Sequence, residues 1–403
     1  MRNRVRPGGP PEAEPLAPPD DEGSGRREPR GLATAWHVAA TTTLTSTPVF
    51  LPGAASPLID RDLGWSAGGL GAVLSVFWLG SLIGAWLSRR IRVPLAAERV
   101  LAAAMLVTAV ALAAVAVLPA AGLWAGGALG GGAYGFSQPY GNQALLRRCA
   151  PGVRGRAFGL KQAAVPAATL LCSVVMPVAA VPLGWRAVFG GGAVVCLGYA
   201  AVLALRGPGE PWRGPVSGGL GWDRRLAALA GVGLLGAAIG NSLGAFLILT
   251  LVGDGFDLTG AGLLAAAAAA LSVLVRIGAG WVTDRSQGRG WRDLTAMFAI
   301  GAVGTALLAA GSRPLGAAGA FLGYAGGWGW AGLLHYLAGA AYPGRERAAT
   351  ALTQMGVSLG AAVGPFGFGQ LYELGAGRAW WLMAAAAVAG TAGAVTAARI
   401  RSA

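Results

Sequence analysis

Few side chains in this chain could bind a polar solute, and those few stand inside long apolar stretches. Lys161, the only lysine, lies about one turn inside such a stretch, and His37 and His335 are the only histidines. A cation in hydrocarbon costs about 2.5–3.5 kcal/mol on insertion scales. Lys161 therefore either extends its stem to the water boundary or anchors an anion. Arg276 lies near the end of another stretch, where pairing or extension to the boundary explains its charge.

The acidic residues are as informative as the basic ones, because none of the 17 lies in the middle of an apolar stretch. Proteins that move protons through membranes commonly use a buried carboxylate, so here only His37 or His335 could take that role. Enzymes need clustered nucleophiles, carboxylates or metal ligands, and the three cysteines show no metal-ligand spacing. We therefore expect no enzyme activity, no metal and no cofactor.

The sequence around these residues indicates a membrane protein. Of the 403 residues, 55% are apolar and 12% are charged, against about 25% charged in soluble domains. The net charge of +14 comes from arginines in short loops, so we expect no nucleic-acid partner. A helix that crosses a bilayer needs about 20 mostly apolar residues. The sequence thus predicts an all-α integral membrane protein with twelve transmembrane helices, at residues 32–52, 67–87, 100–118, 123–146, 157–181, 187–205, 226–252, 262–282, 294–311, 317–341, 348–371 and 379–398.

The twelve expected spans divide into two groups of six. Residues 1–30 are rich in proline, glycine and charge, and we expect them to form a disordered cytoplasmic tail. Residues 31–205 would form the first six-helix bundle and residues 226–403 the second. Residues 206–225 are polar and would form the cytoplasmic connector between the bundles.

The placement of the arginines predicts the orientation of the chain. If the N-terminus is cytoplasmic, 25 basic residues lie on the cytoplasmic side and four lie opposite, at Arg61, Arg186, Arg313 and Arg378. Because basic loops stay in the cytoplasm, we expect a multi-pass protein of the inner or plasma membrane with both termini cytoplasmic. Tryptophans near the expected span ends, Trp185 and Trp380 among them, suit an interfacial belt. We expect a monomer whose partners are the lipid bilayer and a small molecule.

The two halves of the sequence repeat parts of each other. Residues 151–165 and 343–357 share a Pro-Gly start, a pair of arginines and a later glutamine, at an offset of 191 to 192 residues. Residues 84–89 and 280–285 form a second echo at a similar offset. Many secondary transporters are built from duplicated halves, so these echoes favour a transporter.

The second of these echoes carries a family resemblance. The loop motif of the major facilitator superfamily reads Gly, three residues, Asp-Arg, then a further Gly and Arg, and it is matched here by Gly280, Asp284, Arg285, Gly288 and Arg289. The first-half copy has Ser88 where the family has Asp. The chain therefore resembles this superfamily over roughly residues 32–398. Residues 156–162 are similar to the cyanate-permease-type branch.

The resemblance implies two bundles that rock about a central cavity lined by spans one, four, seven and ten. Span one carries a polar stripe spaced by three or four residues, hence on one helix face. We therefore expect a substrate site formed by His37, Thr41, Thr45, Tyr134, Gln138, Asn142, Asn241, Trp328, His335 and Tyr336, with Lys161 from span five. Hydrogen bonds between helices would explain the same residues without a substrate.

The resemblance also implies a gate on the cytoplasmic side. We expect Asp284, with Arg285 and Gly280, to hold that side closed by contacting a positive helix N-terminus or a nearby arginine such as Arg156. A solvated loop carboxylate is the alternative reading of Asp284.

These observations predict a transporter of a small solute, anionic or neutral, working by alternating access. The alternative is a multidrug or metabolite exporter of the same fold. Gly356, Gly360 and Gly364, followed by Pro365, are similar to the drug-antiporter motif, but they fall in span eleven, whereas that motif belongs to span five. Small residues at this period let helices approach closely. Import or export, and the coupling ion, stay open.

Overall fold

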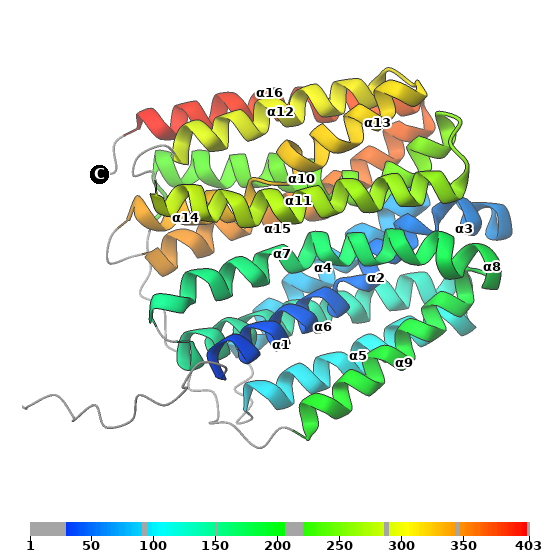
Figure 1. Cartoon of the computed structure of the whole chain (residues 1–403), viewed down its shortest axis with the longest axis horizontal. Helices are drawn as coiled ribbons and strands as arrows, with labels where there is room; N and C mark the ends of the chain where they lie inside the picture. The colour runs from blue at the N-terminus through cyan, green and yellow to red at the C-terminus, as the bar shows by residue number, and fades with distance from the viewer. Residues whose placement is uncertain are drawn as a thin grey trace, which may run out of the picture.

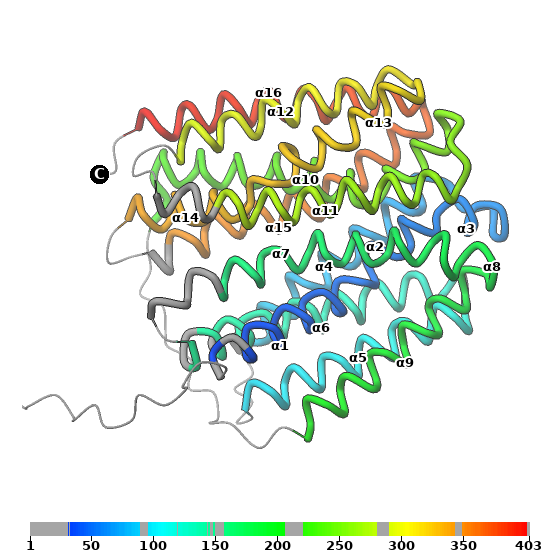
Figure 2. Tube along the Cα trace, in the orientation of Figure 1, coloured from blue at the N-terminus to red at the C-terminus, as the bar shows by residue number. Residues whose placement is uncertain are grey.

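A computed structural model describes residues 30–90, 96–149, 151–205, 221–285, 290–342 and 346–400, and the elements in these ranges are helices. This confirms the all-α prediction. Residues 1–29 of the expected tail, residues 206–220 of the expected connector, and Gly288 and Arg289 of the loop motif lie outside the described residues. Figure 1 shows long helices lying side by side in two groups, and Figure 2 traces the same path along the chain.

The first half contains six spans and one short extra helix. The first span is broken into two helices, and the fifth continues through a π-helical turn. In chain order the elements are α1 Arg30–Thr45, α2 Thr47–Ala54, α3 Ser56–Leu63, α4 Ala67–Arg90, α5 Ala97–Val117, α6 Pro119–Arg148, α7 Pro151–Val175, η1 Met176–Ala180, α8 Val181–Leu183 and α9 Trp185–Ala204.

The second half repeats this plan with a broken tenth span. Its elements are α10 Arg224–Gly253, α11 Leu258–Arg285, α12 Gly290–Ala309, α13 Arg313–Leu322, η2 Gly323–Gly327, α14 Ala331–Ala340, α15 Glu346–Glu373 and α16 Ala376–Arg399. Each of the twelve expected spans therefore falls on one helix or on one interrupted helix.

Eight spans in the described residues are long and apolar enough to cross a bilayer: α4, α5, α7 with its continuation, α9, α10, α11, α12 and α16. The first and tenth spans miss this criterion because they are interrupted. Helices α6 and α15 miss it because they carry many glycines and polar residues. A span that faces other helices or a cavity can be less apolar than one that faces lipid. The first, fourth and tenth spans are among those expected to line the cavity.

The two halves meet along a few helices. Helices α4, α5, α6 and α9 pack together in the first half, and α10, α12, α15 and α16 in the second. Contact between the halves runs through α4 with α15, α7 with α11, and α2 with α10 (Figure 1). The start of α1 and the end of α16 lie at the same end of the molecule. We call this the arginine-rich end, and the other the opposite end.

Glycines bring helix backbones into direct contact inside each half. A methyl group added at Gly356 would lie 2.0 Å from the Ala230 carbonyl oxygen of α10, and one at Gly360 would lie 1.9 Å from that of Leu234. Only glycine fits such positions. The close approach expected from the glycine spacing in α15 is therefore confirmed.

At the break between α1 and α2, side-chain hydroxyl groups donate hydrogen bonds to the backbone carbonyls. Pro48 lacks an N–H and therefore cannot bond the Leu44 carbonyl four residues earlier, and the Thr47 hydroxyl donates to that carbonyl instead, at 2.7 Å. Three neighbouring hydroxyls also bond back to carbonyls of the same helix: Thr41 to His37, Thr45 to Thr41 and Ser46 to Thr42, at 2.7–2.8 Å. The interruption thus leaves these backbone groups paired.

Candidate functional site

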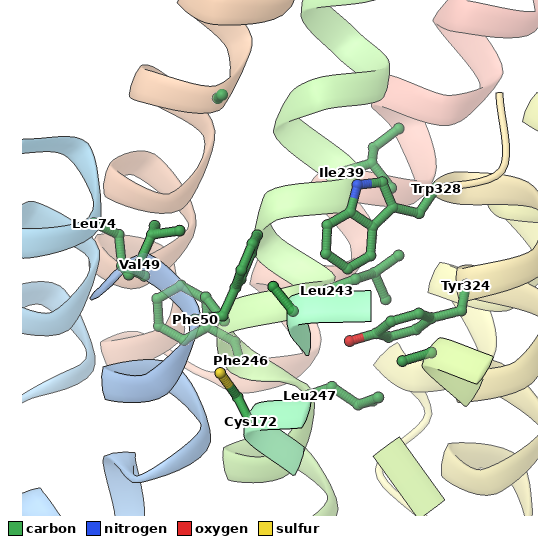
Figure 3. Close-up of a cluster of buried hydrophobic side chains, with 14 of the residues drawn as sticks. Val49, Phe50, Leu74, Cys172, Ile239, Leu243, Phe246, Leu247, Tyr324 and Trp328 are labelled. Atoms are coloured by element: carbon green, nitrogen blue, oxygen red, sulfur yellow. The ribbon is translucent and has the colours of Figure 1, made fainter. Parts of the chain in front are cut away.

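A hydrophobic plug closes the space between the halves towards the opposite end. Val49, Phe50 and Leu74 of the first half meet Phe246 and Trp328 of the second, and each is at most 3% exposed. The Phe50 and Trp328 rings lie 5.5 Å apart in an edge-on arrangement. Figure 3 shows Phe50 directed across the interface towards the second half.

Beyond the plug, α4 and α15 continue the closure. The Ser75 hydroxyl donates to the Ala362 carbonyl at 2.5 Å. The Gly68 N–H donates to a Glu373 carboxylate oxygen at 2.8 Å, so the end of α15 caps the start of α4. The halves are therefore in contact from the plug to the opposite end.

A polar cluster occupies the interface on the other side of the plug. Lys161 of α7 donates to the Asn142 side-chain oxygen of α6. Arg276 of α11 donates through Nη1 to the Gln162 carbonyl of α7 at 2.7 Å, and through Nε and Nη2 to the Trp328 carbonyl at 3.1 and 2.6 Å. Arg276 therefore links the two halves, using a carbonyl next to Lys161 and one at the break of the tenth span.

His335 extends this cluster into the second half. Its Nδ1 atom is bonded to the Ala331 carbonyl at 2.7 Å and its Nε2 atom to the Gln354 side-chain oxygen of α15 at 2.9 Å. His335 lies on α14, which follows the Trp328 carbonyl that accepts the Arg276 bonds. These contacts define the central cluster, which consists of Asn142, Lys161, Gln162, Arg276, His335 and Gln354.

The central cluster is more accessible than the plug. Asn142, Lys161, Arg276 and His335 are partly exposed and Gln354 is exposed. Lys161 lies ten residues from the start of α7 at Pro151, or about 15 Å along the helix. The plug separates the cluster from the opposite end, so the cluster lies on the side of the arginine-rich end.

The structure brings together only some of the residues predicted for the substrate site. Asn142, Lys161 and His335 belong to the cluster, and the Trp328 carbonyl joins it while the Trp328 ring belongs to the plug. Tyr134 packs on Phe77 and Trp78.

The other predicted residues lie outside the central cluster. Thr41 and Thr45 are buried, and their hydroxyls bond their own helix. His37 pairs with the Tyr199 hydroxyl of α9 at 2.7 Å. Asn241 donates to the Ala237 carbonyl, and its side-chain oxygen is buried without a partner among the described residues. Gln138 is half-buried on α6, and Tyr336 is 53% exposed on α14.

The residues of the expected gate lie near the ends of two helices. Gly280, Asp284 and Arg285 lie in the last turns of α11, and Arg156 lies in the first turns of α7. Their side chains fall outside the described residues. The gate at the arginine-rich end therefore stays a prediction.

The site prediction omitted Arg276, Gln162 and Gln354. Arg276 is the second cation inside a span, which was a signal in the sequence. Gln162 and Gln354 occupy matching positions of the repeated segments 151–165 and 343–357. The structure brings both to the cluster, one through its carbonyl and one through its side chain. The internal repeat could therefore have located them.

The charged side chains of the central cluster are all positive. The described carboxylate side chains all lie at helix ends or in the segments between helices, at Asp60, Asp62, Glu98, Asp223, Asp254, Asp257, Asp293 and Glu373. Ion pairs between described residues join Arg148 to Glu98 and Arg186 to Asp62, away from the cluster. The cluster thus presents two cations to a ligand together with neutral hydrogen-bonding groups.

Solved structures with the same architecture are transporters. A bacterial homologue of the human lysosomal transporter Spinster has a TM-score of 0.68 at 16% identity, with 93% of this chain and 98% of that chain covered. The nucleoside transporter NupG has a TM-score of 0.67 at 12% identity, with 91% and 100% covered. A D-xylose–proton symporter has a TM-score of 0.69 at 14% identity, with 92% and 97% covered. At these identities the likeness concerns the fold.

Sequence comparison gives the family. No curated protein sequence matches this chain significantly. The family model for the Major Facilitator Superfamily matches residues 38–292, which is more than half of the chain. The resemblance seen in the loop motif is thereby confirmed, and the cyanate-permease branch stays a prediction. The chain is an integral membrane protein that belongs to the Major Facilitator Superfamily of transporters.

Proposed function

We propose that this protein transports a small organic anion by alternating access. The observation that carries the proposal is the pair of cations, Lys161 and Arg276, one from each half, in a central cluster that contains no carboxylate among the described residues. The arginine-rich end would face the cytoplasm of a cell whose inner or plasma membrane holds the protein as a monomer.

The charge of the cluster favours an anion over other solutes. A cation within a membrane bundle is costly unless a partner compensates it. Lys161 is bonded to a neutral amide and Arg276 to neutral carbonyls, so neither charge is cancelled by the described residues. A carboxylate ligand would supply the missing charge. The nucleoside transporter and the xylose symporter share the fold, so the fold does not select the substrate, whereas the charge of the site does.

The position of the cluster supports alternating access. It lies between the halves, so a rocking motion would close the arginine-rich end around a ligand and separate the plug residues on the other side. In this proposal Lys161 and Arg276 bind the negative group, and the side-chain amides of Asn142 and Gln354 donate hydrogen bonds to the rest of the solute.

A thermal-shift experiment on the purified protein tests the anion proposal. Acetate, malonate and succinate are compared with xylose and with the cation tetraphenylphosphonium, at one ionic strength. A ligand that binds only the folded state raises the melting temperature in proportion to RT ln(1 + [L]/Kd). We expect stabilisation by a carboxylate, and its loss in Lys161→Gln and Arg276→Gln.

The matched control is Arg186→Gln, which removes one positive charge from an exposed ion pair with Asp62 at the opposite end. This variant should keep the response to carboxylates. Stabilisation by tetraphenylphosphonium alone would instead favour the exporter alternative. If carboxylates raise the melting temperature of Lys161→Gln as much as that of the parent protein, the central cluster is not the anion site.

A further inference from the structure

We propose that this carrier exchanges one anion for another and does not return empty across the membrane. The inference rests on the proposed anion site and concerns what happens when that site is vacant. It starts from the charge of the central cluster and from where that cluster lies between the halves.

The first step is that the two cations have spare hydrogen-bonding capacity. Arg276 has five N–H donors, and its bonds to the Gln162 and Trp328 carbonyls use three of them. Lys161 has three donors and gives one to Asn142. An anion can therefore join both side chains while the contacts seen in the structure persist.

The second step concerns the vacant site. Lys161 and Arg276 come from opposite halves, and Arg276 bonds the carbonyl of Gln162, the residue next to Lys161. While the arginine-rich end is accessible, water can solvate the two charges. Closing that end around a vacant site would remove this water and hold two like charges together with no described carboxylate between them. Uncompensated charges in a low-dielectric interior are strongly unfavourable, so the vacant site resists closure.

The third step is that an anion removes this barrier. A carboxylate bound between Lys161 and Arg276 replaces the repulsion with two attractive contacts, one to each half. The loaded carrier can therefore close around its ligand and open on the other side. It then needs a second anion before it can return. The expected cycle is an exchange of anions, in which net uptake into a compartment without anions is slow.

The structure offers a nearly isosteric variant that tests this account. The Asn142 side-chain oxygen already accepts the Lys161 hydrogen bond, so Asn142→Asp would place a permanent carboxylate at the same position. That carboxylate would cancel one of the two charges. The vacant variant should cross the membrane more readily, and it should bind anions less tightly. Asn142→Thr is the control, because it alters the hydrogen bond without adding charge.

The experiment measures uptake of radiolabelled malonate and succinate into proteoliposomes that contain either the same unlabelled anion or none. Valinomycin and equal potassium concentrations hold the membrane potential at zero, so that net charge movement does not limit uptake. We expect uptake by the parent protein to be at least tenfold faster with anion inside. The ratio should fall to about twofold or less in Asn142→Asp and stay high in Asn142→Thr.

Equal uptake into loaded and unloaded vesicles by the parent protein would overturn the exchange proposal, even with the anion site intact. Failure of both anions to stabilise the protein or to be taken up at all would instead overturn the proposed function. If Asn142→Asp does not elute as a folded protein, Asn142→Glu places a carboxylate beside Lys161 on a side chain one methylene longer and keeps both cations. It should show the same fall in ratio, and an unchanged ratio there would also contradict the proposal.

Discussion

Replacing Gly71 by alanine should open the opposite end of the transporter without unfolding either half. Gly71 lies on α4, and a methyl group added there would stand 2.3 Å from the Pro365 carbonyl oxygen of α15. The two helices belong to different halves. The clash can therefore be relieved by separating the halves, which is the motion that alternating access requires.

The size of the effect follows from the overlap. Non-bonded heavy atoms normally lie about 3.5 Å or more apart, so α4 and α15 would have to separate by roughly 1 Å. Overpacking of this kind typically costs about 1–3 kcal/mol. Since the open state avoids the cost, the balance between closed and open states should shift by about 5- to 150-fold.

Two other glycines provide the contrast. A methyl group at Gly135 of α6 would lie 1.9 Å from the Ser81 carbonyl oxygen of α4, inside one half. Gly135→Ala should therefore lower the melting temperature, because rocking cannot relieve that clash. A methyl group at Gly367 of α15 would meet nothing within 4 Å. Gly367→Ala should change neither the stability nor the closed state.

The assay uses a reporter cysteine at Ser56, which is 6% exposed and lines a pocket between the halves at the opposite end. The native residues Cys149, Cys172 and Cys196 are buried, so maleimide labelling in nanodiscs reports chiefly on position 56. Labelling should be at least fivefold faster with Gly71→Ala and unchanged with Gly367→Ala. Unchanged labelling in Gly71→Ala, together with a fall in melting temperature like that of Gly135→Ala, would refute the reasoning.

Two further predictions concern groups outside the spans. Burial raises the pKa of Asp254 at the end of α10, and one of its carboxylate oxygens is buried without a described partner. Asp254→Asn should raise the melting temperature at pH 7, and the gain should shrink as the pH falls through the raised pKa and vanish below about 3.9, where the carboxyl is protonated in both states. Burial opposes ionisation of Asp223, but bonds from the Leu226 N–H and the Tyr342 hydroxyl outweigh it and lower its pKa. At pH values above the ordinary Asp pKa, where the carboxylate is charged, Tyr342→Phe should lower the free energy of unfolding by about 1 kcal/mol. The loss should become smaller as the pH falls through the lowered pKa. Thermal denaturation of each variant and the parent protein over a range of pH checks both predictions. Tyr336→Phe, which changes an exposed tyrosine, is the control and should leave stability unchanged.

The sequence was sufficient to locate the spans and the seams between helices. Apolar length and arginine placement report directly on the bilayer, so each of the twelve expected spans lies on a helix. Glycine spacing in α15 reports on backbone approach, and the added-methyl distances at Gly356 and Gly360 bear this out. The span positions and the close helix contacts depend on residue types repeated over a helical turn or more, and a single sequence is enough to show such patterns.

The contacts of single side chains could not be predicted in this way. Trp185 and Trp380 suited the interfacial belt, yet both are buried. Their indole N–H groups donate to Asp62 at 3.2 Å and to Thr250 at 3.0 Å. For Arg276 the sequence indicated pairing or extension to the boundary, but it did not indicate that a partner, the Gln162 carbonyl, lies in the other half. In each case the partner lies on another helix, far away along the chain, and the spacing of residues within one helix carries no record of it.

The run of hydroxyl groups in the first span has a mechanical consequence. When a helix bends within the hydrocarbon region of a membrane, some backbone carbonyls usually lose their hydrogen-bond partners, and water must then enter to replace those partners. Here Thr41, Thr45, Ser46 and Thr47 carry their own replacement donors on short side chains. Such back-bonding is known to favour helix bending. The first span can therefore bend without admitting water. This bending would let one half tilt against the other without creating a water-filled path for ions.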